Sequence, residues 1–186
     1  MCVGGFRLAS IGHVIFGLAA ARFVDPAAPM RQRLYTAIGL ATLSLAPDLD
    51  VIAFRFGIPY EAPFGHRGAS HSLVFAVLFG AAIGALWRRE MRRPKLVIPV
   101  CAVLVATHGL LDMLTDGGEG VALAWPFSNA RMFFPWQPLP VAPIGRALLS
   151  ARGLYVFAVE MLWFAPLVAY GLWPPRRVPI TPASPP

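Results

Sequence analysis

The sequence contains few charged residues. Asp, Glu, Lys and Arg make up 13% of the 186 residues, hydrophobic residues make up 57%, and the mean hydropathy is +0.62. Soluble globular domains contain about 25% charged and about 45–50% apolar residues, so this composition favours a membrane protein. The sequence also lacks a Gly-rich phosphate-binding loop, an internal repeat and a nucleic-acid-binding motif. We therefore expect no nucleic acid partner, despite the net charge of +7.

Cysteine is also scarce. Cys2 and Cys101 are the two cysteines, and Cys101 lies inside an apolar run, so neither a disulfide nor a cysteine-built metal site is expected. The length suits one domain. We expect a single transmembrane domain over residues 1–175, followed by a Pro-rich disordered tail over residues 176–186.

The sequence is rich in long apolar runs. A transmembrane helix needs about 20 mostly apolar residues, with a range of about 17–25. Three segments satisfy this length and two come close, and the five are 8–24, 34–47, 71–88, 96–115 and 153–173. The second is short and would be completed by the "DVIAF" that follows it. The expected fold is all-α: a polytopic transmembrane helical bundle of about five helices.

The basic residues indicate an orientation in the membrane. The stretch "RREMRRPK" (88–95) carries five of them, the loop 22–33 adds three and the tail adds two, so ten of the 16 fall on one side. Because Lys and Arg gather on the cytoplasmic side, we assign this side to the cytoplasm and the N-terminus to the outside. Two long loops, 48–70 and 116–150, then lie on the outer side.

All four histidines and several aspartates lie within or beside apolar runs. An ionisable residue at the membrane centre costs about 2.5–3.5 kcal/mol, so several together indicate mutual pairing or a function. His108 and Asp112 are four residues apart and face the same side of a helix. Asp48 and Asp50 would share one side of an extended segment. The predicted metal ligands are His13, Asp48, Asp50, His66, His71, His108 and Asp112.

Seven ligands exceed what one tetrahedral ion needs. They suit two divalent ions that share a bridging Asp, with Zn²⁺ preferred and Mn²⁺ or Fe²⁺ as alternatives. Such ions activate water for attack on a phosphate ester. We assign catalytic roles to Asp48 and Asp112, and we expect Arg67 to hold the phosphate. Ser70 is the expected cap of the helix that follows His71.

Simpler roles remain open for these residues. His13 alone would more often be hydrogen-bonded to a neighbouring helix, and His108 with Asp112 would form an ordinary buried pair. Arg67 would then contact lipid headgroups.

Two further acids are less clearly part of this set. Glu160 is a further ligand, an acceptor for an imidazole N–H, or a partner of Arg152, and we favour the second role. Asp116 lies in a Gly-rich turn and is expected to be solvated.

The motifs "GHVIFG", "APDLD", "HRGASHSL", "HGLLDMLTDGG" and the following "WPF" cover residues 12 to 127. They resemble the bacterial membrane-bound metal-dependent hydrolase family, described as LexA-binding and associated with the inner membrane. The order of His, Asp pair, His–His and H-x3-D is also similar to zinc-dependent phospholipase C. The resemblance implies an inner-membrane location and hydrolysis of phosphate esters at a metal site built on helices.

The expected function is therefore an inner-membrane metal-dependent hydrolase. Its substrate would be a phospholipid or another lipid-linked phosphate ester, attacked by water that two metal ions activate, with the site on the outer side. Two alternatives from other classes are a metal or proton transporter that uses the same His/Asp cluster, and a non-enzymatic regulatory membrane protein. The second would bind a cytosolic protein partner through residues 88–95 or the tail.

Overall fold

The regular structure is helical throughout the part of the chain that can be described. The computed structural model describes residues 11–26, 28–143 and 149–173, and these residues contain no β-strand beyond two isolated bridges. The elements are α1 (Ile11–Val24), α2 (Met30–Ser44), η1 (Ala46–Phe56), η2 (Ala69–His71), α3 (Leu73–Trp87), η3 (Arg88–Glu90), α4 (Pro94–Met113), α5 (Ala151–Trp163) and α6 (Ala165–Leu172), where η marks a 3₁₀ helix. The predicted all-α class is confirmed.

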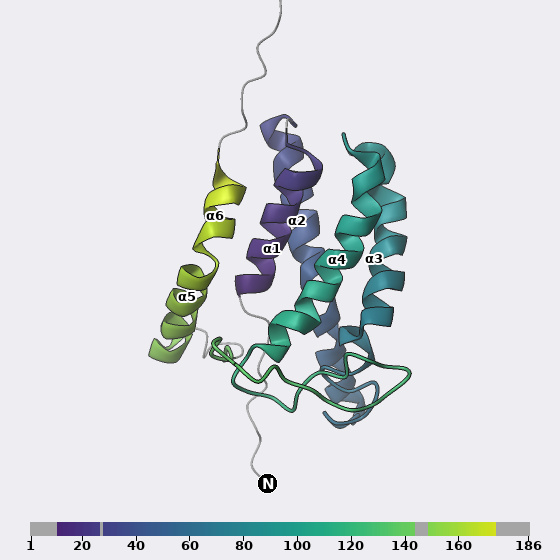
Figure 1. Cartoon of the computed structure of the whole chain (residues 1–186), viewed down its shortest axis with the longest axis vertical. Helices are drawn as coiled ribbons and strands as arrows, with labels where there is room; N and C mark the ends of the chain where they lie inside the picture. Colours follow the sequence, from purple (N-terminus) through teal and green to yellow (C-terminus); the bar gives the residue numbers. More distant parts are fainter. Residues whose placement is uncertain (1–10, 27, 144–148, 174–186) are drawn as a thin grey trace, which may run out of the picture.

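The helices α1 to α4 form the bundle, and α5 and α6 lie along its α1 side (Figure 1). The helices α3 and α4 pack closely, because Gly80 and Gly84 face the α4 backbone. A Cβ at Gly80 would lie 2.5 Å from the Ala102 Cα, and one at Gly84 would lie 2.7 Å from the Ile98 Cα. Glycines spaced four apart allow this approach, which is typical of helix pairs in membranes.

Large apolar side chains point outward from the bundle. The buried residues of α3 are all small (Ala76, Gly80 and Gly84), whereas Leu78 is 68% exposed and Leu86 is 73% exposed. A helix in water buries its large apolar residues, so this inverted pattern suits a lipid environment.

Of the five expected spans, between one and three are supported among the described residues, and α1 and α3, of 14 and 15 residues, are shorter than a full span. α4 is long and apolar enough to cross a membrane on its own, and the bent pairs α2–η1 and α5–α6 meet the test if each pair is one span. The predicted single helix over 153–173 is wrong, because the chain bends by 71° between α5 and α6. Pro166 explains the break, since proline lacks an N–H and clashes with the preceding helical turn.

The break between α2 and η1 lies at Pro47 and turns the chain by 45°. Asp48 and Asp50 therefore lie on a helical segment, and the expected extended conformation is wrong. The expected cap at Ser70 is wrong as well, because Ser72 caps α3 by accepting the Phe75 N–H at 3.1 Å.

The two long connections cover one end of the bundle, at the bottom of Figure 1. They include residues 57–68 and 114–143, and the Val121–Met132 and Thr115–Leu139 bridges tie the second one together. The predicted disordered tail, 176–186, lies outside the described residues. The covered end is where the His/Asp set gathers.

Candidate metal centre

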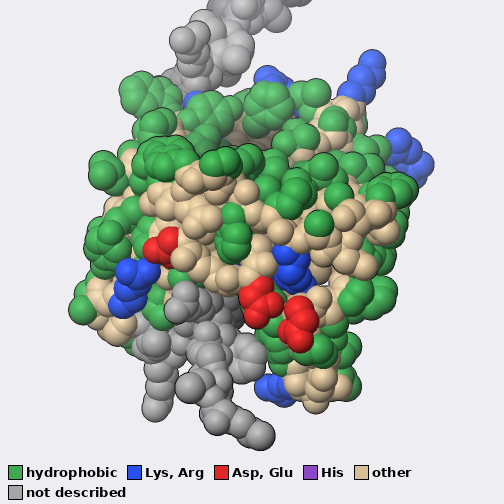
Figure 2. Space-filling view, turned by 60° about the horizontal axis from the view of Figure 1, so that its bottom comes forward, with side chains coloured by type: hydrophobic (Ala, Val, Ile, Leu, Met, Phe, Trp, Pro, Cys, Tyr) green, Lys and Arg blue, Asp and Glu red, His purple; other side chains and the backbone are tan. Residues whose placement is uncertain are grey.

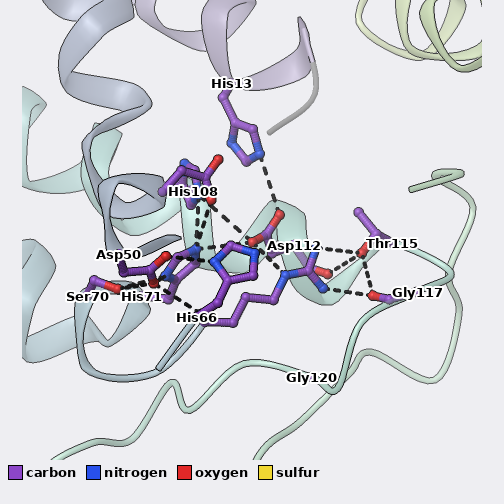
Figure 3. A network of polar contacts seen from close by, with 12 residues as sticks. His13, Asp50, His66, Ser70, His71, His108, Asp112, Thr115, Gly117 and Gly120 are labelled. Carbon is purple, nitrogen blue, oxygen red and sulfur yellow. Dashed lines mark hydrogen bonds and ion pairs between the residues drawn. The ribbon is translucent and has the colours of Figure 1, made fainter. Parts of the chain in front are cut away.

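All seven predicted ligands meet in one connected network at the covered end of the bundle (Figure 3). Six of them are buried, and Asp50 is half-buried. They come from four separate segments: α1, η1, the 66–71 stretch that ends with η2, and α4. The seven residues selected from the sequence thus lie together in the folded chain.

His108 is held with one particular ring nitrogen facing the cluster. Its Nδ1 lies 2.6 Å from the backbone oxygen of Ser44, and because a carbonyl can only accept, Nδ1 carries the hydrogen. The Nε2 lone pair then points toward His71 Nε2, 3.1 Å away. Gly109 makes this approach of α4 to η2 feasible, since a Cβ there would lie 2.5 Å from the His71 carbonyl oxygen.

Four donor atoms surround one point: Asp48 Oδ1, His71 Nε2, His108 Nε2 and Asp112 Oδ2. From His71 Nε2 the distances are 3.1 Å to His108, 3.5 Å to Asp48 and 3.3 Å to Asp112. From His108 Nε2 they are 3.4 Å to Asp48 and 3.8 Å to Asp112. A tetrahedral zinc ion with bonds of about 2.0–2.1 Å requires ligand separations of about 3.3–3.4 Å. The donor set fits such an ion in type and in spacing.

Asp50 anchors a second group that consists of Asp50, His66 and His71. Its Oδ1 lies 2.7 Å from His66 Nδ1, and its Oδ2 lies 3.1 Å from His71 Nδ1 and accepts the Ser70 hydroxyl at 2.5 Å. With Nδ1–H directed at a carboxylate, the other nitrogen of His71 is presented as a lone pair, the usual arrangement behind a metal-binding imidazole.

The electrostatics of His71 follow from three surrounding carboxylates. This residue lies in η2, outside the candidate spans. Burial alone lowers the pKa of His71, but contacts with Asp112, Asp48 and Asp50 outweigh burial and hold the pKa well above its ordinary value. The cluster therefore stabilises a positive charge at the position of the His71 ring.

Asp112 connects the four-atom group to His13. While Asp112 Oδ2 belongs to that group, Oδ1 lies 3.5 Å from His13 Nε2, and the His13 ring stacks on His108 with centroids 3.9 Å apart. The carboxylate thus has the two-sided arrangement expected of a bridging Asp. His71 belongs to both His/Asp groups, which the sequence did not lead us to expect.

Arg67 is buried within the network, and its guanidinium faces protein groups. Its Nε lies 3.0 Å from Asp112 Oδ2, Nη1 donates to the Gly117 carbonyl at 2.8 Å, and Nη2 donates to Thr115 Oγ1 at 3.3 Å. Its backbone has a left-handed φ of 58° and donates its N–H to Asp50 Oδ2 at 3.1 Å. One residue therefore connects the carboxylates of η1 and α4, and the expected phosphate contact stays a prediction.

The two further acids differ in position. Glu160 is fully buried, and its Oε2 accepts the Gly12 N–H at 3.0 Å, one residue before His13. Asp116 is exposed, as expected. It also has protein partners, since Oδ1 accepts the Val141 N–H at 2.7 Å and Oδ2 lies 3.7 Å from Arg152 Nη2.

Some members of the network had no recognisable signal in the sequence. The Ser44 and Gly117 carbonyls are backbone groups, and every residue has one. Thr115 follows the "HGLLDML" run directly, so its position one turn after Asp112 was available as a hint.

Comparison with known proteins identifies relatives in bacterial membranes. The model of the family described as YdjM inner membrane protein matches residues 8–176. The Escherichia coli K12 protein named inner membrane protein YbcI is 41% identical over 126 residues, which is 65% of this chain and 71% of that protein. No solved structure matches. Both names give a location and mention neither a metal nor a reaction.

Proposed function

Since the chain belongs to the YdjM inner membrane protein family, we propose that it is a metal-dependent hydrolase that cleaves phosphate esters at the membrane surface. The observation that carries the proposal is the set of four buried donor atoms that all lie within 4.8 Å of one another. Two carboxylates and two imidazoles would neutralise a divalent ion, and the mixed N/O set suits Zn²⁺, with Mn²⁺ or Fe²⁺ as alternatives.

Divalent ions at such a centre lower the pKa of water and polarise a phosphoryl oxygen. The chain's own residues would prepare the site for this chemistry. Asp50 holds His71 with its Nε2 turned inward, and the Ser44 carbonyl does the same for His108. Asp48 is the proposed acceptor of the water's proton, and Arg67 adds a fixed positive charge 3.0 Å from Asp112.

A second ion would use the His13 side of Asp112, because Oδ1 faces His13 while Oδ2 faces the four-atom group. His13 and Asp112 would supply protein donors there, and water and substrate would complete that position. A pair of ions sharing one carboxylate is a common arrangement for the displacement of a phosphate ester.

A lipid-linked substrate is supported by the surroundings of the site. On η1, Asp48 and Asp50 face the cluster, whereas Leu49, Ile52 and Phe56 are exposed. Figure 2 shows the covered end, where a few charged side chains lie among hydrophobic ones. An amphipathic segment of this kind lies at the depth of lipid headgroups. We propose that the chain crosses the membrane several times with this end on the outer side.

The first test is metal content per chain, measured by elemental analysis on full-length protein purified in detergent without a His-tag. We expect one or two equivalents of zinc, manganese or iron, loss of the metal in His108→Ala, and full retention in Glu61→Ala, an exposed acid of the same end. The same samples are assayed for phosphate release from phosphatidic acid and from a soluble aryl phosphate. Metal-free wild-type protein, even after reloading, would overturn the metal centre.

A second candidate function, a structural metal site in a non-enzymatic protein, is favoured by the number of protein ligands. Four protein ligands with no open position are typical of structural metal sites, whereas catalytic zinc usually has three. In that case the ion would hold α4, η1 and η2 together in a non-enzymatic regulatory protein. Stoichiometric metal, lost in His108→Ala and accompanied by no turnover on any phosphate ester, would favour this role.

A further inference from the structure

A groove lies on the α1 side of the bundle, away from the metal centre. It has a volume of about 360 Å³ and runs between α1, α2 and α6. In Figure 1, α6 lies beside the upper part of α1. Both Ile11 and Arg22 line the groove, so it follows α1 for about 16 Å at 1.5 Å per residue.

The groove is apolar along most of its length and basic at one end. Ile11, Leu18 and Leu172 are among the apolar lining residues. Arg22, in the last turn of α1, and Arg33, in the first turns of α2, line the end that is far from His13. This arrangement is amphipathic along the groove, with two positive charges at one end.

The guanidinium groups of Arg22 and Arg33 differ in the contacts that they make. Arg22 donates to the Trp173 carbonyl and lies 5.0 Å from the centroid of the Tyr170 ring, so its position is fixed. The guanidinium of Arg33 makes no hydrogen bond or ion pair within the described residues. Arg33 acts on the buried Asp25 carboxyl through its charge alone, so its guanidinium N–H groups are available for an anionic ligand beside the apolar groove.

Acidic residues of the chain do not neutralise this end. Asp25, in the connection between α1 and α2, is buried and lies 3.4 Å from Arg92. Glu90, in η3, is exposed and lies near α2, where its backbone oxygen accepts from the Gln32 side chain. The basic residues of this end outnumber these two acids, so the local charge is positive.

We propose that the groove binds one anionic phospholipid of the inner membrane, with an acyl chain along α1 and the phosphate between Arg22 and Arg33. Basic pockets between membrane helices recognise anionic headgroups, and each Lys or Arg near the membrane surface contributes about a fivefold preference. Zwitterionic lipids share the tails but lack the net negative charge. The proposal is independent of the metal centre and of hydrolysis.

The test is native mass spectrometry of full-length protein released from detergent after incubation with equal amounts of phosphatidylglycerol and phosphatidylcholine of identical acyl chains. We expect one retained lipid per chain, with phosphatidylglycerol preferred by about fivefold or more. Arg33→Gln is expected to reduce the preference by about fivefold. The matched control is Arg89→Gln, an exposed arginine that does not line the groove, which should retain the preference.

A second variant tests the apolar part. Ala37→Phe places a ring into the groove and is expected to lower retention of both lipids, while thermal stability in detergent reports whether the bundle remains folded. Equal retention of the two lipids by the wild type would overturn the proposal, as would equal losses in Arg33→Gln and Arg89→Gln. A lipid-free dimer would also overturn it and would identify a second copy of the chain as the occupant.

Discussion

The two ends of the bundle differ in where their charged side chains lie. At the covered end, carboxylates and imidazoles from four segments are buried and point toward one another. At the other end, the basic side chains are spread over the surface, and they are Arg22, Arg31, Arg33, Arg88, Arg89, Arg92, Arg93 and Lys95. Dispersed cations orient a chain in the membrane, whereas converging acids and bases are costly unless something binds between them. The meeting of buried charged side chains at one point, more than their number, therefore identifies the functional end.

The largest expected effect is a loss of bound metal, tested by an Asp→Asn substitution at each end of the bundle. Asp112→Asn removes a charged donor from the four-atom group and is expected to abolish metal binding and any activity that depends on it. Asp25→Asn changes a buried aspartate near the opposite end and should retain all the metal. Elemental analysis of both variants beside the wild type measures this. Equal metal loss in the two variants would remove the distinction between the ends.

Arg67→Gln is expected to weaken metal binding without abolishing it. The Arg67 side chain lies 3.0 Å from Asp112, so its loss frees that carboxylate to move, whereas the backbone N–H that bonds to Asp50 is kept in the variant. Residues that orient metal ligands typically contribute about 10–100-fold in metal affinity. Competition with a zinc chelator measures the change, and Arg55→Gln, an exposed arginine of η1, is the control. Unchanged affinity in Arg67→Gln would contradict the positioning of Asp112 by this residue.

Metal affinity is expected to fall as the pH is lowered. The raised pKa of His71 means that its ring is protonated in the metal-free protein at neutral pH, and a metal must displace that proton. The affinity should change by about tenfold per pH unit for each displaced proton, and it should rise with pH until His71 titrates. Zinc titrations between pH 6 and 8 in the presence of a chelator of known affinity measure the slope. A flat profile would show that metal binding displaces no proton from His71, contrary to the raised pKa.

The smallest effect concerns the stability contributed by Asp25. Burial raises the pKa of this carboxyl, with Arg92 and Arg33 opposing the shift. A carboxyl with a raised pKa stabilises the fold in its protonated form, and this contribution is lost as the pH rises above about 4. Asp25→Asn should therefore unfold at the same temperature as the wild type near pH 4. At pH 7 its unfolding free energy should be unchanged or higher by less than about 1 kcal/mol, as judged from melting in detergent. A markedly less stable variant at pH 7 would show that the Arg92 contact stabilises the fold.

Hydropathy and helical spacing predicted most of the helical regions and the side chains that meet at the covered end. The apolar runs predicted the regions of α1, α3 and α4, and polar residues within or beside the apolar runs predicted the seven side chains of the network. Local features were harder. The break at Pro166 was missed because a Pro inside an apolar run is also compatible with a kinked continuous helix.

The directions of individual side chains were not predictable. Ser70 and Ser72 are equally good caps by residue type, and only the path of the chain turns Ser70 toward Asp50 and Ser72 toward Phe75. In the same way, an arginine beside two histidines suggested a phosphate contact, whereas its guanidinium reaches Thr115 and Gly117, distant in the sequence. Such contacts depend on tertiary packing, which no local pattern encodes.

The bend between α2 and η1 has a consequence for mutational tolerance. Pro47 interrupts the helical hydrogen-bond ladder, so the Asp48 N–H bonds to Leu45 at 3.2 Å, and the Ser44 carbonyl is left to His108. Because the acceptor is backbone, the side chain at position 44 is replaceable, and Ser44→Ala should be tolerated. Pro47→Ala would favour a continued helix and would take this carbonyl away from the imidazole. Pro47, which supplies no ligand atom, would thus be less replaceable in a saturation screen than Ser44, whose backbone oxygen makes the contact with His108.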